Sequence, residues 1–189
     1  MMGVKRMLKR WHRAAVVVGT VLMIVVGGNP VSAAADATGA KTQDLIMSVR
    51  GAGPYRIGAT LQRLTAAGLV VDPAPIPGCD DIIVAGATGG WAGNILLTFR
   101  SNRLRVIETA TDAVRSRSGA TVGMSFAELE QIYGRRGHLI HNSAGRVGYV
   151  VRVGNRAELF TDHPFRSGVG AFQVGPHRLL VRQFLFRGC

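Results

Sequence analysis

The pattern of apolar and polar residues predicts two short helices, 65 positions apart, that begin in the same way. The first follows Thr60 and ends at Gly68, whereas the second follows Ser125, with Glu128 three residues later, and ends at Gly134. A Ser or Thr before a helix accepts hydrogen bonds from its first free amides, and Glu three residues later completes a capping box. Since an apolar residue and a Gly precede both, we predict an internal repeat.

Runs of apolar and β-branched residues predict antiparallel hairpins after each helix. Residues 94–100 and 103–110 flank a Ser-Asn turn, and residues 148–153 and 156–160 flank a Gly-Asn turn. Residues 179–186 alternate poorly and predict one last strand, buried on both faces. The segment 72–78 holds three prolines and predicts an extended loop with no regular element.

These elements predict an α+β fold of two tandem repeats, each a short helix followed by antiparallel strands, that together form a curved sheet. The first repeat covers residues 44–112 and the second covers residues 113–189. Residues 34–43 are small and polar and predict a flexible segment ahead of the first repeat.

The amino-terminal residues predict export. A basic head with five Lys and Arg precedes the apolar run 14–26, and Val31-Ser32-Ala33 offers small residues to a signal peptidase. We therefore predict a signal peptide over residues 1–33 and a secreted, extracellular protein. A retained membrane anchor is the alternative, but the run is shorter than the ~20 residues of a spanning helix. No Cys follows the run to carry a lipid.

Charge narrows the class of partner. Without the five basic residues of the head, 18 Lys and Arg remain against 11 Asp and Glu, a net charge of about +7. A basic exported protein can bind an acidic protein, an acidic cell-wall polymer or nucleic acid. The chain has no nucleic-acid motif and no long basic run, so we expect an extracellular or envelope protein as partner, with wall polymer as the alternative.

The chain has two cysteines, Cys79 and Cys189. In an exported protein such a pair most simply forms one disulfide. It would join the proline-rich loop of the first repeat to the end of the second, and closing so long a loop stabilises a fold by several kcal/mol. A reactive thiol or a metal ligand remains the alternative, although neither residue belongs to a CxxC motif.

Candidate catalytic and metal-binding residues are few. His138 and His141 are three apart, so on a strand they face opposite sides and cannot share a metal. Asp80 and Asp81 lack a third oxygen ligand in register. The Gly-rich segment 86–93 resembles a phosphate loop, but no Lys and no helix follow it. We expect no cofactor, no metal and no enzymatic activity.

The predicted hairpins carry the residues for a binding surface. Arginines lie near both turns, with one Trp and one Tyr nearby in sequence, and these residue types are enriched at interface hot spots. The candidate protein-binding residues are Trp91, Arg103, Arg105, Tyr149, Arg152 and Arg156. The alternative is that Trp91 and Tyr149 lie in the core and the arginines only solvate the sheet.

The motif Gly119-x-x-Val122-Gly123-Met124-Ser125, followed by Tyr133-Gly134, resembles the repeat of the SmpA/OmlA family of outer-membrane lipoproteins. In tandem it is similar to the β-lactamase-inhibitory-protein fold, as in secreted actinobacterial proteins that carry one such duplication. The resemblance implies a binding or assembly module that offers a concave sheet to a protein. The chain departs from it in lacking a lipidated Cys and in pairing its two cysteines between the repeats.

The sequence therefore predicts a secreted, non-catalytic protein-binding module, monomeric or weakly associating, with no membrane span once the signal peptide is removed. An inhibitor of an extracellular β-lactamase or peptidase is one alternative, with residues 73–81 as the inserting loop. A cell-wall-binding or envelope-associated protein is the other.

Overall fold

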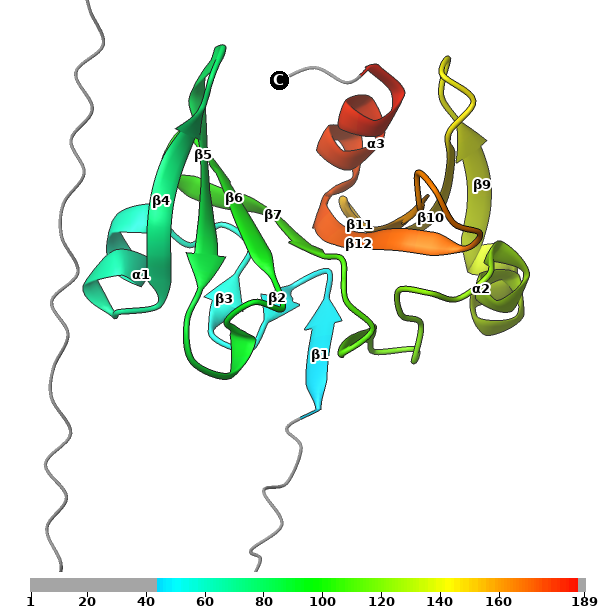
Figure 1. Cartoon of the computed structure of the whole chain (residues 1–189), viewed down its shortest axis with the longest axis horizontal. Helices are drawn as coiled ribbons and strands as arrows, with labels where there is room; N and C mark the ends of the chain where they lie inside the picture. Colours follow the sequence, from blue (N-terminus) through cyan, green and yellow to red (C-terminus); the bar gives the residue numbers. More distant parts are fainter. Residues whose placement is uncertain (1–43, 187–189) are drawn as a thin grey trace, which may run out of the picture. The chain divides into compact units, whose positions relative to one another are not determined.

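An antiparallel sheet of eight strands (Figure 1), in the order β4-β5-β6-β7-β12-β11-β10-β9, is the largest element of the described residues. The computed structural model describes residues 44–186. The first four strands are β4 (Val70–Ile76), β5 (Cys79–Ala87), β6 (Leu96–Arg100) and β7 (Arg103–Thr109). The other four are β9 (Gly137–His141), β10 (Val147–Val153), β11 (Arg156–Asp162) and β12 (Val169–Pro176). The predicted hairpins are confirmed as β6–β7 and β10–β11.

A second sheet has four short strands in the order β3-β2-β1-β8. These are β1 (Leu45–Ser48), β2 (Gly51–Ala52), β3 (Tyr55–Arg56) and β8 (Val114–Ser116). Strands β1 and β8 pair in parallel, with Leu45 opposite Val114. This pairing joins the first residues of the described chain to the segment that follows β7.

Both predicted helix starts are confirmed. Helix α1 (Leu61–Ala66) is capped by Thr60, whose side chain accepts the Arg63 amide proton. Helix α2 (Phe126–Tyr133) is capped by Ser125 in a complete capping box with Glu128. Two 3-10 turns, η1 (Gly89–Trp91) and η2 (Gly134–Arg136), and a third helix, α3 (His177–Phe186), complete the structure.

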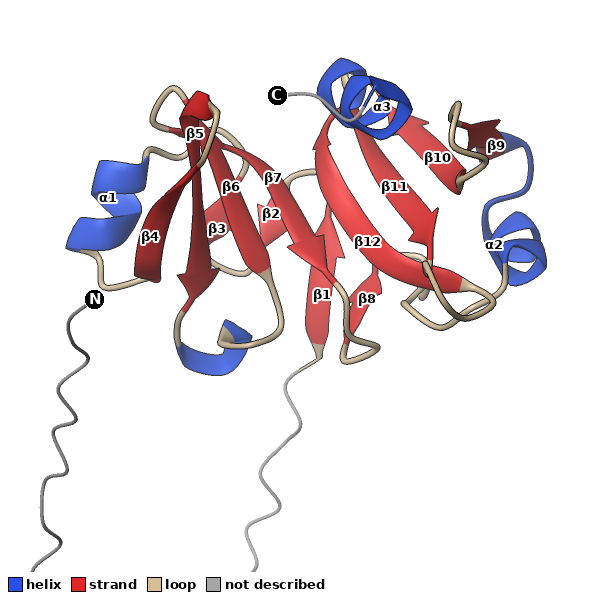
Figure 2. Ribbon diagram, turned by 45° about the horizontal axis from the view of Figure 1, so that its top comes forward, coloured by secondary structure: helices blue, strands red, loops and turns tan. Residues whose placement is uncertain are grey.

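The eight-stranded sheet is buried on both faces over β10, β11 and β12. One face packs with the four-stranded sheet and α2 in a core that includes Met47, Leu129 and Phe160. The other face carries Val150 and Leu159, which pack against Leu180 of α3. Figure 2 shows α3 lying against β11 and β12. Since successive strand residues face opposite sides, the apolar runs in these strands fill both cores.

The predicted fold class was wrong. Of the described residues, 48% are in strands and 21% are helical, and the structure is not a tandem repeat of helix-then-strand α+β units. The sheet crosses the predicted boundary at residue 112, because Ile107 of β7 pairs with Val174 of β12. Tertiary pairing between distant strands, which local periodicity does not report, produces this mostly β architecture.

Two segment predictions were also wrong. The proline-rich segment is strand β4, which pairs with β5 alone and forms an edge of the sheet. An edge strand tolerates proline because one side of its backbone needs no partner. The last predicted strand is helix α3, in which Leu180 and Phe184 lie one turn apart on its buried side.

The predicted signal peptide 1–33, the flexible segment 34–43 and Cys189 lie outside the described residues. Cys79 begins β5 and is partly buried. Its disulfide with Cys189 and the cleavage after Ala33 therefore stay predictions. Among residues 44–186, no helix is long and apolar enough to span a membrane.

Candidate functional site: a basic pocket at the start of α3

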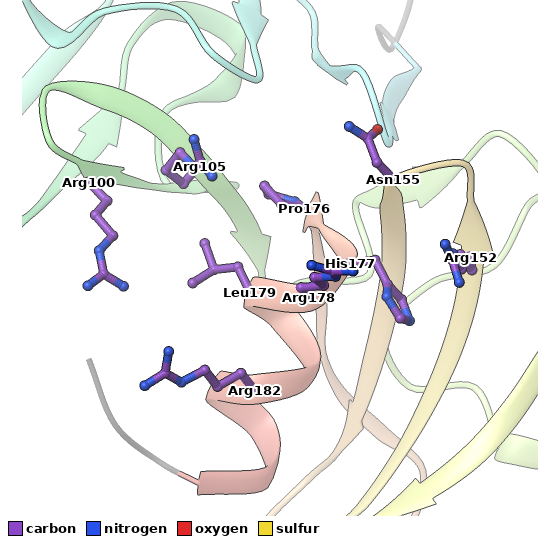
Figure 3. A pocket seen from close by; sticks show the side chains of 9 residues that line it. All are labelled: Arg100, Arg105, Arg152, Asn155, Pro176, His177, Arg178, Leu179 and Arg182. Atoms are coloured by element: carbon purple, nitrogen blue, oxygen red, sulfur yellow. The ribbon is translucent and has the colours of Figure 1, made fainter.

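A pocket of about 650 Å³ lies on the face of the eight-stranded sheet that carries α3. We call it the arginine pocket. Figure 3 shows the nine residues that line it, which come from β6, β7, β10, the β10–β11 turn, the end of β12 and α3. They are Arg100, Arg105, Arg152, Asn155, Pro176, His177, Arg178, Leu179 and Arg182. The volume falls within the range of about 300–1,000 Å³ that is usual for small-ligand sites.

The lining is strongly positive. Five of its nine residues are arginines, and none is an Asp or Glu. Arg100 is paired with Asp81, with 2.8 Å between Nε and Oδ2. The other four arginines make no ion pair with a described residue. The pocket therefore holds an excess of positive charge that an anionic ligand can neutralise.

Arg105 is the most constrained of these arginines. Its side chain projects from β7 and is partly buried, and its Nε is fully buried without a hydrogen-bond partner among the described residues. A buried donor without an acceptor costs about 1–3 kcal/mol. In Figure 3, Arg100, Arg105 and Arg182 surround Leu179 in the pocket. An oxyanion between these side chains would provide the missing acceptor.

The pocket also contains the amino-terminal end of α3. This ten-residue helix begins at His177, whose backbone amide donates to the Asn155 carbonyl at 2.9 Å. The residue before it is Pro176, which has no side-chain oxygen to cap the helix. The free amides and the dipole of a helix amino terminus favour negative charge. The helix end and the arginines therefore favour the same class of ligand.

His177 contributes a polar imidazole to the arginine pocket. Burial lowers the pKa of its imidazole, and the positive charge of Arg152 lowers this pKa further. The lowered pKa favours the neutral imidazole, so the positive charge of the pocket comes chiefly from its arginines. A bound anion would reduce the second effect and raise the pKa of His177.

The structure separates the four arginines that the sequence placed on one binding surface. Arg105 and Arg152 line the arginine pocket, whereas Arg103 and Arg156 lie outside it. Arg103 Nη1 donates to the Gly58 carbonyl at 3.2 Å, and Arg156 Nη1 donates to the Val49 carbonyl at 3.1 Å. These last two contacts fasten neighbouring segments of the fold.

The two aromatic residues of the predicted surface are core residues. Trp91 is 8% exposed, and its indole ring lies directly against Gly53. Tyr149 is fully buried in β10, where its neighbours in the core include the Tyr133 ring. Neither side chain is available to a partner, so their assignment to the binding surface is corrected. Tyr149 and Arg152 are three residues apart in β10, so alternation places them on opposite faces of the sheet, Tyr149 in the core and Arg152 at the arginine pocket.

Sequence reasoning missed three of the five arginines of the pocket, namely Arg100, Arg178 and Arg182. Arg178 and Arg182 are four apart and share one face of α3. The predicted strand 179–186 began after Arg178, so the sequence did not place Arg178 and Arg182 on one element. The signal that could have found them is the spacing of Leu180, Val181 and Phe184, which fits one side of a helix.

The loop between β11 and β12 exposes an aromatic residue that the sequence did not single out. Phe165 is 91% exposed. His163 Nδ1 accepts hydrogen bonds from the amides of Phe165 and Arg166 at 3.0 and 3.1 Å, which holds the loop in shape. The predicted inserting loop, residues 73–81, instead belongs largely to the edge hairpin of β4 and β5.

A chain of buried hydroxyl groups on the opposite face of the sheet ends at Glu158. Ser116 Oγ accepts the amide protons of Ser118 and Ala120, so its own proton can go to the Tyr133 hydroxyl at 2.8 Å. The Tyr133 proton goes in turn to Glu158 Oε2 at 2.6 Å. Glu158 and Tyr133 are only 7% and 3% exposed. Burial raises the pKa of both, and the negative charge of Glu158 raises that of Tyr133 further.

Glu158 is expected to make stability depend on pH. Since burial raises the pKa of Glu158 above its ordinary value of 4.5, the folded protein favours the protonated carboxyl. This contribution is complete below pH 4.5 and is lost as the pH rises through the folded pKa. Relative to the wild type, Glu158→Gln should therefore gain free energy of unfolding from pH 4 to pH 7, measured by urea denaturation. Exposed Glu130→Gln is the control, and a difference for Glu158→Gln that stays constant with pH would contradict the prediction.

Metal-binding residues do not gather in the described chain. Residues 44–186 contain no group of three His, Cys, Asp or Glu side chains that could hold an ion. Asp81 is instead the partner of Arg100.

Comparison with known proteins names no family. No family model matches the chain, and no curated protein matches it. One similar solved structure is an extracellular protein containing an SCP domain from Bacillus anthracis, at 10% identity and a TM-score of 0.44, over 67% of this chain and 46% of that one. Another is the yfeY protein from Escherichia coli, at 11% identity and a TM-score of 0.44, over 69% of this chain and 99% of that one. This chain thus spans about half the length of the first, and neither likeness carries an argument about function.

Proposed function

We propose that this chain is an exported, non-catalytic binding module that takes an acidic group of an extracellular protein into the arginine pocket. The observation that carries the proposal is the set of five guanidinium groups around one pocket that no carboxylate lines. Arginine binds carboxylates in a planar, two-bond geometry and carries its charge at all physiological pH values. Export rests on the basic head, the apolar run and the Val31-Ser32-Ala33 site in the sequence.

The chemistry of the lining favours binding over catalysis. The pocket offers guanidinium groups, one amide, one imidazole and the first turn of a helix. General acid–base catalysis needs a group that changes protonation near the working pH, and covalent catalysis needs an activated nucleophile. The lining contains no Ser, Thr, Cys, Lys, Asp or Glu to serve as a nucleophile, and no carboxylate of the lining is present to orient His177 as a base.

A pair of matched peptides tests the proposal. We expect the protein to bind a Glu-rich peptide and to bind the same peptide with Gln in place of Glu at least tenfold more weakly, by isothermal titration calorimetry. The affinity for the Glu-rich peptide should fall as salt rises, because screening weakens attraction between partly exposed charges. Equal binding of the two peptides, or binding of neither, would overturn the proposal.

An acidic wall polymer is the second candidate partner. The helix end in the pocket favours it, because helix amino termini bind phosphate groups as well as carboxylates. Retention of the protein on isolated wall that carries a phosphodiester polymer, and its release when that polymer is removed, would support this candidate. The difference in affinity between the Glu-rich and Gln-rich peptides does not bear on retention by the wall, so the two tests are independent.

A further inference from the structure

A second pocket of about 300 Å³ lies on the face of the eight-stranded sheet opposite the arginine pocket. Its walls come from both sheets and from α2. Glu158 and Val151 contribute from β11 and β10, Val49 follows β1, and Tyr133 ends α2. We call this cavity the Glu158 pocket. Its volume is at the lower end of the range for ligand sites, which favours a small ligand.

The buried carboxyl of Glu158 has unused bonding capacity. Its Oε2 accepts one hydrogen bond from Tyr133, whereas Oε1 accepts none from a described residue and is not sealed from solvent. No described Arg, Lys or His forms an ion pair with it. An ionised carboxylate can accept about four hydrogen bonds, and a buried one is normally paired with a positive group. The positive charge of Arg136 acts on Glu158 from the pocket rim and partly offsets the effect of burial on its pKa, but no described cation contacts the carboxyl directly.

The rim of the same pocket has the opposite charge. Arg50, Arg117 and Arg136 line it and are all exposed. Arg136 donates to the carbonyls of Ile132 and Tyr133 at 3.2 and 3.3 Å, which holds it at the rim. Arg50 and Arg117 make no side-chain hydrogen bond to a described residue. The pocket thus combines one negative group within it with three positive groups around its opening.

This charge arrangement discriminates among small ligands. A simple anion would meet the carboxylate of Glu158, and a simple cation would have to pass the three arginines. A zwitterion satisfies both, with its ammonium on Glu158 and its carboxylate on the arginines. Val49, Val151 and Val153 provide an apolar wall for a short aliphatic side chain.

We propose that the Glu158 pocket binds a free α-amino acid with a small apolar side chain. The proposal goes beyond the binding of an acidic partner at the arginine pocket, because it uses different residues on the opposite face of the sheet. Glu158 holds the ammonium group, the rim arginines hold the carboxylate, and the Ser116–Tyr133 hydroxyl chain orients the Glu158 carboxyl.

The experiment uses the exported protein purified from culture fluid, with L-alanine, D-alanine and L-valine as zwitterionic probes. Acetate and methylamine are the matched probes that carry only one of the two charges. By saturation-transfer NMR and calorimetry, we expect at least one amino acid to bind at least tenfold more tightly than acetate or methylamine. Glu158→Gln, which keeps the shape of the side chain, should weaken that binding at least tenfold.

A second variant separates binding from folding. Arg117→Gln changes an exposed residue at the rim, so it should weaken amino-acid binding while leaving the melting temperature unchanged. Arg105→Met, in the arginine pocket, should leave amino-acid binding unchanged. Binding of none of the three amino acids, equal binding of acetate, or full binding by both Glu158→Gln and Arg117→Gln would overturn the proposal. Because the peptide test concerns only the arginine pocket, failure of one proposal is distinguishable from failure of the other.

Discussion

Replacing Arg105 by Met and Arg178 by Gln in one variant is expected to lower the affinity of the protein for a Glu-rich peptide by roughly 30- to 100-fold. Arg105 is partly buried and holds a donor without a partner. Since its guanidinium is charged, its hydrogen bond to a carboxylate is charge-assisted and stronger than a neutral one. Arg178 is exposed and contributes less, because water and salt screen its charge. Together they should contribute about 2–3 kcal/mol, where each 1.4 kcal/mol is tenfold in affinity.

The size and place of this loss can be checked by calorimetry against a matched control. Arg63→Gln removes the same charge from the exposed side of α1, away from the arginine pocket. It should change the affinity by less than threefold. If Arg63→Gln weakens binding as much as a single change in the pocket, the peptide responds to net charge and the pocket is not its site. Methionine at position 105 retains the apolar stem of the side chain, so packing in β7 is preserved.

Replacing Phe172 by Ala is expected to destabilise the protein by about 3–5 kcal/mol. Phe172 of β12 is fully buried and stacks on Phe160 of β11, with 4.4 Å between ring centroids. Its removal leaves a cavity where β12 joins the two halves of the eight-stranded sheet. For a chain of this size the melting temperature should fall by about 6–20 °C. Urea and thermal denaturation measure both quantities.

Phe165→Ala is the matched control for this change. It deletes the same ring from a site that is 91% exposed, so the free energy of unfolding should change by about 0.5 kcal/mol or less. A loss below 1 kcal/mol for Phe172→Ala would mean that the side chain is not in the core and that β12 does not pair as described. The same Phe165 variant also tests whether the β11–β12 loop takes part in peptide binding. Since Phe165 does not line the arginine pocket, binding of the Glu-rich peptide should be unchanged.

The two pockets suit ligands of different charge because different elements pack on the two faces of the sheet between them. Helix α3 brings two arginines and a helix end to one face. On the other face, the four-stranded sheet and α2 enclose a carboxyl group that β11 alone would expose. One face therefore favours multiply charged anions and the other favours a small dipolar molecule.

Local signals were sufficient for the elements that depend on neighbours in sequence. Thr60 and Ser125 cap their helices as predicted, since a cap bonds to amides two or three residues away. The β6–β7 and β10–β11 hairpins formed as predicted, because a short turn between two apolar runs determines both strands. The candidate site was partly found for the same reason, as Arg105 and Arg152 lie beside these turns.

The rest depended on contacts between residues that are far apart in the chain. The sequence by itself determined the helix caps, the hairpins and an excess of arginine. Only the tertiary structure decided that β12 lies between β7 and β11, that Trp91 and Tyr149 point into the core, and that α3 brings Arg178 and Arg182 to Arg105. The physical reason is that strand pairing and burial are set by the summed packing of the whole chain, whereas caps and turns are set by bonds within a few residues.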